Sequence, residues 1–359
     1  VQSTTYGARL ESKFAFGKNI FYTGLDYKHE GAENIRMIMP AMMPMRDGTS
    51  WQDSSIDQIG WFNEYQINFK NSKLVASLRL DYNKGDAKAL SNLFKTLYGD
   101  GKAENFNHSL SLGYNKNLCN HNQLGIWLGR AQRSGSLTER YINRFAVGID
   151  AYELVGNPDL KPETNNQIDL IFTHKKDNIF FQADVFYSYL ENYISGVIVP
   201  IKPYSMTAPG TRQIQNIEKA FKTGVETRFN WQFLPKFRTE LAAAYTYAED
   251  IDNNNPLPEI APLDFRWNVL ADFSPVSLGL HYRYSAKQSR INPTFGEFTT
   301  PEFSVFDFTS KYNVFKNATL SFDVLNIFDR AYAEHLNRTL STNKKQRILA
   351  AGRSFNIGF

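Results

Sequence analysis

Apolar and polar residues alternate with a period of two through most of this chain, and this pattern constrains the fold more than any other feature. At the end of the chain, Phe355, Ile357 and Phe359 alternate with small or polar residues. Between Phe221 and Trp231, apolar residues such as Val225 and Phe229 alternate with charged residues such as Glu226 and Arg228. Successive side chains of a strand point to opposite faces. The pattern therefore predicts strands whose two faces meet different environments.

The alternating segments are too long for an ordinary soluble sheet. They commonly run for about 10 to 15 residues, whereas strands of soluble proteins average about 5 or 6. A tilted strand that crosses a membrane needs about 9 to 11 residues. Lipid-facing rings and aromatic girdles would also account for the 28 Phe, 19 Tyr and 5 Trp among 359 residues. We therefore expect an all-β, transmembrane antiparallel β-barrel.

Short and long breaks alternate along the chain. The short breaks are at 17–19, 71–72, 116–121, 176–178, 234–236, 274–275 and 316–317. The long, polar or proline-rich breaks are at 30–57, 85–104, 134–162, 193–216, 249–262, 288–301 and 330–349. Outer-membrane barrels have short periplasmic turns and longer external loops. The order predicts a chain that enters from outside and ends in the periplasm.

This rhythm gives about fifteen strands, an odd number, whereas bacterial barrels have an even number. We therefore interpret residues 1–359 as part of a barrel with the 22 strands typical of outer-membrane transporters. An incomplete sheet would expose two edges with unpaired backbone groups, so we do not expect this segment to fold alone in a membrane.

Several other classes of protein fit the sequence poorly. The formal charge is only +4, from 40 basic and 36 acidic residues, so we expect no nucleic-acid partner. The single cysteine, Cys119, excludes an intrachain disulfide. No G-x-S-x-G, H-E-x-x-H or Walker sequence occurs, so we do not expect an enzyme. A barrel enzyme with a dispersed catalytic triad is the alternative from another class.

Three stretches carry a family resemblance. They are Gly156 to Glu163 (GNPDLKPE), Asn326 to Asp329 (NIFD) with Tyr332 close behind, and Gly352 to Phe359. In sequence, order and separation they resemble the TonB-dependent receptors of the bacterial outer membrane. The whole chain would then be a partial barrel domain, without counterparts of the family's plug domain and TonB box.

The resemblance implies a function and a set of partners. It implies an active-transport receptor that imports a metal chelate, such as a siderophore complex, with energy from the TonB complex. The metal complex would be cargo, and no cofactor is expected. Outer-membrane lipid would surround the barrel, and Phe359 resembles the C-terminal aromatic residue that the barrel assembly machinery recognises. A passive porin is the nearest alternative.

The motif residues themselves have plainer structural explanations. Pro158 and Pro162 fix the backbone and interrupt strand pairing where a loop re-enters a sheet. Asn326 and Asp329 are suited to cap a turn through bonds from side chain to backbone. We therefore expect none of these residues to touch the substrate.

A methionine cluster suggests a more specific alternative, a copper receptor. Thioethers are soft ligands that suit Cu(I), although methionine also fills space in loops or contacts apolar ligands. Five of the six methionines fall in one predicted external loop: Met37, Met39, Met42, Met43 and Met45.

Charged residues on the polar face of the strands are candidates to line the lumen. They would suit an anionic metal chelate, but polar side chains also line any large, water-filled barrel. These candidates are Arg79, Glu226, Arg228, Arg266 and Arg283. The histidines are scattered, and Cys119 with His121 makes an incomplete metal site.

Overall fold

The computed structural model describes residues 2–34, 50–144, 152–204, 208–337 and 347–359, and they form one large antiparallel sheet with two short helices. The elements are β1 (Gln2–Phe16), β2 (Asn19–Glu33), β3 (Ser54–Asn68), β4 (Ser72–Ala87), α1 (Asn92–Tyr98), β5 (Ala103–Asn117), β6 (Asn122–Arg133), α2 (Leu137–Tyr141), β7 (Glu153–Val155), β8 (Glu163–Lys176), β9 (Ile179–Val199), β10 (Thr211–Leu234), β11 (Phe237–Asp250), β12 (Asn255–Pro256), β13 (Asp264–Asp272), β14 (Val276–Ser285), β15 (Phe303–Phe315), β16 (Ala318–Leu325) and β17 (Ser354–Gly358).

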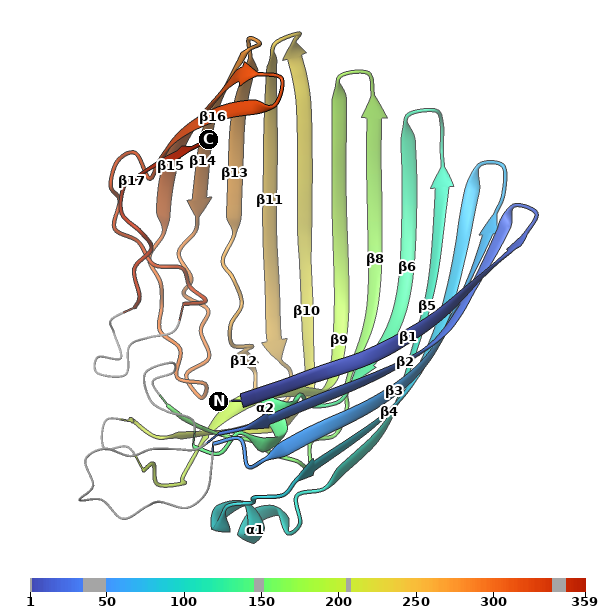
Figure 1. Ribbon diagram of the computed structural model, residues 1–359, viewed down its shortest axis with the longest axis vertical. Coiled ribbons are helices and arrows are strands. Elements are labelled where there is room, and N and C mark those ends of the chain that lie inside the picture. The colour runs from blue at the N-terminus through green and yellow to red at the C-terminus, as the bar shows by residue number, and fades with distance from the viewer. Residues whose placement is uncertain (1, 35–49, 145–151, 205–207, 338–346) are drawn as a thin grey trace.

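The sheet is a meander in which each long strand pairs with the next one along the chain. Two short strands, β7 and β12, lie in loops and pair beside β10 and β11. Without these two, fifteen of the 17 strands make up the wall, as the rhythm of the sequence predicts. In the described part of the chain, β1 pairs only with β2 and β17 only with β16, so the sheet is curved but open (Figure 1).

The two ends of the sheet differ as predicted. All seven short breaks are tight hairpin turns, and they lie along one end, which we call the turn end (Figure 1). The longer connections and both helices lie at the opposite end, the loop end. Neither described helix is long and apolar enough to cross a membrane as a helix.

The predicted loop from Tyr193 to Asn216 is wrong in extent. β9 continues to Val199 and β10 begins at Thr211, so most of this range is paired strand. The polar and proline content suggested a loop, but the backbone pairing continues until Pro200, which has no N–H to donate. The two short helices inside the other loops were not predicted.

The distribution of exposed side chains is the reverse of that in a soluble protein. Leu25 and Trp61 lie opposite each other on one face and are 53% and 42% exposed. On the other face, Asp81 and Asn107 lie opposite each other, and each is only 4% exposed. Exposure of apolar side chains to water is unfavourable, so this arrangement requires lipid on the face that carries Leu25 and Trp61.

The C-terminal strand follows the same rule. Phe355, Ile357 and Phe359 are 64%, 78% and 94% exposed, and the register places Phe355 opposite Val324 and Ile357 opposite Phe322. These rings and branched chains therefore belong to the apolar face, as the alternation predicts. The small packed clusters of the molecule lie elsewhere, at the loop end, as around Leu190, Ala248 and Leu257.

Candidate ligand-binding site

The strand register places all five predicted lumen residues on the polar face of the sheet. Arg228 and Arg266 lie in one row across β10, β11 and β13, and Arg283 lies opposite Arg266. Glu226 is two residues from Arg228 on the same strand and therefore shares its face. The register of paired residues, followed from β4 across the intervening strands to β10, places Arg79 on that face too. Paired residues share a face of a sheet. The part of these side chains in ligand binding remains a prediction.

Four of these five side chains line a single hollow of about 460 Å³. Ala242 and Ala244 take two of the positions facing the hollow, so small side chains leave room between the charged ones. Asp184 lies directly opposite Glu226, and its buried Oδ1 has no partner among the described residues. The hollow thus has an acidic side on β9 and β10 and a basic side toward β13 and β14. Its lining includes Asp184, Glu226, Arg228, Asp264, Arg266 and Arg283.

Two carboxylates organise the basic side. Asp264 accepts from Nε of Arg266 through one oxygen, at 2.8 Å, and from Nε of Arg283 through the other, at 2.7 Å. Arg283 also donates through both Nη atoms to the two carboxylate oxygens of Glu334, at 2.5 and 3.1 Å. Glu334 belongs to the connection between β16 and β17, so this ion pair joins a loop to the wall. Sequence reasoning missed this role of Glu334.

Arg79 is fully engaged in a separate network. Its guanidinium donates to both oxygens of Asp26, at 2.8 and 2.9 Å, and to both oxygens of Asp81. A Cβ on Gly60 would stand 2.3 Å from Nη2 of Arg79. Glycine is therefore required for this close approach, and Arg79 serves to tie β2 to β4.

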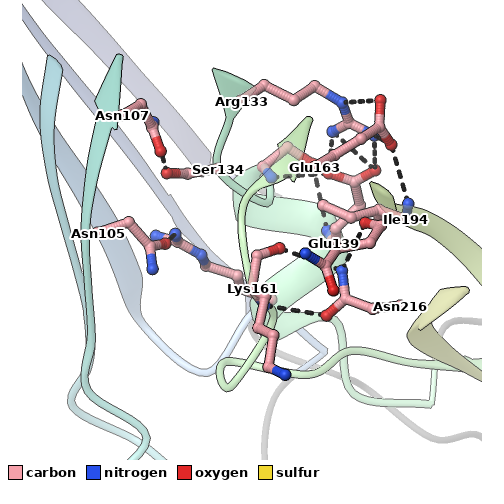
Figure 2. Close-up of polar contacts among 12 residues, drawn as sticks. Asn105, Asn107, Arg133, Ser134, Glu139, Lys161, Glu163, Ile194 and Asn216 are labelled. Atoms are coloured by element: carbon pink, nitrogen blue, oxygen red, sulfur yellow. Dashed lines mark hydrogen bonds and ion pairs between the residues drawn. The ribbon is translucent and has the colours of Figure 1, made fainter. Parts of the chain in front are cut away.

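At the loop end, helix α2 is held against the wall by an arginine with two carboxylates (Figure 2). Arg133, the last residue of β6, donates to Glu139 at 2.9 Å and to Glu163 at 3.0 Å. Glu163 also accepts from the backbone of Ile194 at 2.8 Å. Burial raises the pKa of Glu139, but hydrogen bonds from Arg133 and Ser136 outweigh burial and leave that pKa below its ordinary range.

Ser136 and Glu139 also form a capping box, in which each side chain bonds to the backbone of the other residue. The spacing S-x-x-E is visible in the sequence and was the one available indication of this helix. Sequence reasoning overlooked it.

Arg140 fastens α2 to the strands more deeply. Its side chain is fully buried and donates to Asn83 Oδ1 at 2.6 Å and to Asn105 Oδ1. The next residue, Tyr141, is also fully buried and packs with Ile56. Residues from β3, β4 and β5 thus form the seat of this helix.

The stretch Gly156 to Glu163 has structural contacts of the expected kind. Asn216 accepts from the backbone of Lys161 at 2.9 Å and donates back to its carbonyl at 3.1 Å (Figure 2). Leu160 is 2% exposed and packs with Ile194 and Ile214. A Cβ on Gly156 would meet the carbonyl oxygen of Arg140 at 2.6 Å. This stretch locks the start of β8 to β10 and α2.

The other two motifs bind each other. Asn326 has a φ of +50° and forms the predicted turn cap, accepting from the backbone of Arg330 at 2.8 Å and donating to its carbonyl at 2.9 Å. Asp329 accepts from the backbone N–H of Arg353 at 2.8 Å. The cap therefore guides the chain into β17.

No metal site is formed by the described histidine, cysteine, aspartate and glutamate residues, since no three of them gather suitably. His29 bonds to Asp57 at 2.8 Å and His335 to Thr300 at 2.8 Å, while Cys119 is exposed in a turn. The predicted copper ligands lie outside the described residues: Met37, Met39, Met42, Met43 and Met45.

Comparison with known families agrees with the architecture. The family described as TonB dependent receptor-like, beta-barrel, matches residues 2–327. Heme/hemopexin utilization protein C of Haemophilus influenzae (strain 86-028NP) is 27% identical over 244 residues, which cover 61% of this chain and 34% of that protein. The iron-regulated outer membrane virulence protein of Vibrio cholerae is 25% identical over 197 residues, covering 51% and 30%.

Solved structures share the fold at lower identity. The copper transporter OprC aligns with a TM-score of 0.80 at 21% identity, over 98% of this chain and 55% of that one. The FrpB iron transporter from Neisseria meningitidis (F5-1 variant) gives 0.73 at 12%, over 99% and 55%. The chain spans about a third of the length of these curated relatives and about half of these structures.

The family match covers most of the chain, and the wall has the inverted exposure, the alternating turns and the two faces of an outer-membrane barrel. The turn end is then periplasmic and the loop end extracellular. The chain belongs to the TonB-dependent receptor β-barrel family of the bacterial outer membrane.

Proposed function

We propose that this protein is an active-transport receptor that imports a metal complex across the outer membrane with energy supplied through TonB. The family consists of transport receptors rather than enzymes, and proteins similar to this chain carry titles that name heme, iron or copper. The observation that carries the proposal is the polar, mixed-charge hollow on the inner face. A lining of paired and unpaired ions suits a charged solute better than a hydrocarbon.

Uptake by whole cells tests this proposal. Cells that express the native receptor are given iron as haemin, iron as a set of ferric siderophores, or copper, each with a radioactive metal. Accumulation of at least one complex is expected to depend on both the receptor and TonB. Uptake that continues without TonB would support a passive porin instead, and no receptor-dependent uptake of any complex would contradict the proposal.

Copper is the second candidate cargo. Five methionines between residues 37 and 45 provide soft ligands, and the structurally similar OprC is titled a copper transporter. Replacing all five methionines with serine is expected to abolish Cu(I) binding and receptor-dependent copper uptake, while leaving iron uptake unchanged. Unchanged copper affinity and uptake in that variant would rule this candidate out.

A further inference from the structure

We propose that Arg228, Arg266 and Arg283, hereafter the arginine row, form a seat for the carboxylate groups of an incoming metal complex, and that Glu334 is a tethered competitor for that seat. The inference rests on the proposed transport function and narrows its substrate class. It concerns ligands that bear carboxylates along one edge, because the opposite side of the hollow is itself acidic at Asp184 and Glu226.

The arginine row concentrates positive charge in a way that strands normally avoid. Arg266 and Arg283 are directly opposed across β13 and β14, and like charges in this position destabilise a sheet unless anions are near. Asp264 bonds to the Nε atoms of both side chains. One carboxylate therefore stands between two guanidinium groups, and a second anion is needed to balance the pair.

Glu334 supplies that second anion from a loop. Its two oxygens accept from the two Nη atoms of Arg283, the fork geometry in which arginine binds carboxylates most specifically. Glu334 follows the Asn326 cap in the connection between β16 and β17. A carboxylate thus already occupies one end of the row, which shows that the row accepts this group in bidentate form.

The rest of the row keeps donors available. Arg266 uses Nε in its bond to Asp264, and its side chain is 59% exposed. Arg228 forms no hydrogen bond or ion pair with the residues that the structure describes, and only Ala242 separates it from Arg266 in the row. A carboxylate above Ala242 would meet guanidinium groups from both sides.

A ligand with a second carboxylate beyond Arg266 also competes with Glu334 for Arg283, which lies directly opposite Arg266. When it replaces Glu334, charge-assisted hydrogen bonds are exchanged for similar ones, and the loop loses one of its ties to the wall, while His335 keeps its bond to Thr300 and Tyr332 its stacking on Phe303. Binding at the row is thereby coupled to the position of the Glu334 side chain.

The experiment compares haemin, which bears two carboxylates, with haemin dimethyl ester, in which both are masked. Binding to the purified native receptor in detergent is followed by quenching of tryptophan fluorescence. Wild-type receptor is expected to bind haemin at least about tenfold more tightly than the ester, and the double variant Arg228→Gln/Arg266→Gln is expected to lose about 10- to 100-fold in haemin affinity. Its affinity for the ester is expected to stay the same, which also reports that the barrel is intact.

Two further variants complete the test. Arg238→Gln is the matched control, because Arg238 lies on the same face of β11, is paired with Glu240 and does not line the hollow. It is expected to bind haemin like wild type. Glu334→Gln is expected to bind haemin about three- to tenfold more tightly, since an amide competes less well for guanidinium.

Equal binding of haemin and ester by wild type, or unchanged haemin affinity in the double variant, would overturn the seat. Weaker or unchanged haemin binding by Glu334→Gln would overturn the role of the competitor. These failures differ from failure of the transport proposal, which is measured by TonB-dependent uptake in cells. If the receptor still imports a metal complex but substitution of the arginine row does not change binding, the proposed function stands and only the proposed carboxylate seat is wrong.

Discussion

Substituting Gly85 by alanine should lift helix α2 from its seat. Gly85 lies on β4, and a Cβ there would stand 2.5 Å from Oη of Tyr141, 3.1 Å from Nη1 of Arg140 and 3.2 Å from Cε2 of Tyr141. Tyr141 is fully buried and part of a packed cluster with Ile56, so its ring has little room to move away. The added methyl group must therefore displace the helix or strain the strand.

The magnitude follows from what the displacement breaks. Overpacking a filled site costs about 1 to 3 kcal/mol. Weakening the bond from Arg140 to Asn83 adds about 1.5 to 3 kcal/mol, because the donor is charged. A change from glycine to alanine also lowers the entropy of the unfolded chain, which stabilises the folded state by about 0.4 to 1 kcal/mol. The net loss of docking free energy for α2 should be about 1.5 to 5.5 kcal/mol.

Hydrogen exchange and proteolysis measure this loss in the native receptor. A loss of this size raises the open population by about 10- to 10,000-fold. The amides of Arg140 and Ile142, which bond within the helix to Ser136 and Thr138, should exchange faster by that factor. Trypsin should also cut after Arg140, which is fully buried in the native protein.

Gly129→Ala provides the matched control. Gly129 is also a strand glycine of the polar face, but a Cβ there would have no neighbour within 4 Å. This variant should leave exchange in α2 unchanged. Equal exchange in Gly85→Ala and wild type, or equal acceleration in both variants, would refute the close approach of Tyr141 as the reason for glycine at position 85.

Three other predictions concern pH, the turn cap and assembly. The pKa of Glu139 lies below its ordinary value of 4.5, so its contribution to docking of α2 is present above pH 4.5 and is lost as the pH falls through the docked-state pKa. Hydrogen exchange in α2, corrected for intrinsic rates, should rise in that pH window. Glu139→Gln should remove this rise. Asn326→Ala should destabilise the receptor in urea by about 2 to 4 kcal/mol, from lost hydrogen bonds and positive φ, whereas Asn326→Gly should lose only the hydrogen-bond part; equal losses would contradict the backbone part. Phe359 is 94% exposed on the lipid-facing surface, and Phe359→Leu keeps an apolar side chain there, so this variant should change urea stability by less than about 0.5 kcal/mol. Loss of the ring should slow insertion into the outer membrane, and unchanged insertion in pulse-labelled cells would exclude an assembly role.

Strand rhythm predicted the wall because the constraint behind it is local. Each residue of a membrane strand faces lipid or water according to its parity, so the face of Arg228 follows from its neighbours in sequence alone. The same reasoning wrongly predicted a loop for the range Tyr193 to Asn216. Strands β9 and β10 pair there beyond the span that lipid requires, so their side chains no longer follow a strict alternation.

The loop end was beyond reach for a different reason. Arg140 binds Asn83 and Asn105, and Arg133 binds Glu163, through contacts between distant parts of the chain. Nothing in the neighbourhood of an arginine in sequence states which distant carboxylate or amide it will meet. The sequence contained local indications of the capping box of α2, with Ser136 and Glu139 three residues apart, and of the Asn326 turn cap.

Specificity has the same long-range origin as the loop contacts. Alternation selects a polar residue for the inner face, but the chemistry of the hollow depends on which polar residues share a row across separate strands. Arg228 and Arg266 lie two strands apart in one row, and the small side chain of Ala242 on β11 leaves the space between them open. Arg283 bonds to Glu334, which is 51 residues away in sequence. The same strand rhythm is therefore compatible with different binding surfaces, since a shift of register by two residues keeps every face and rearranges every row.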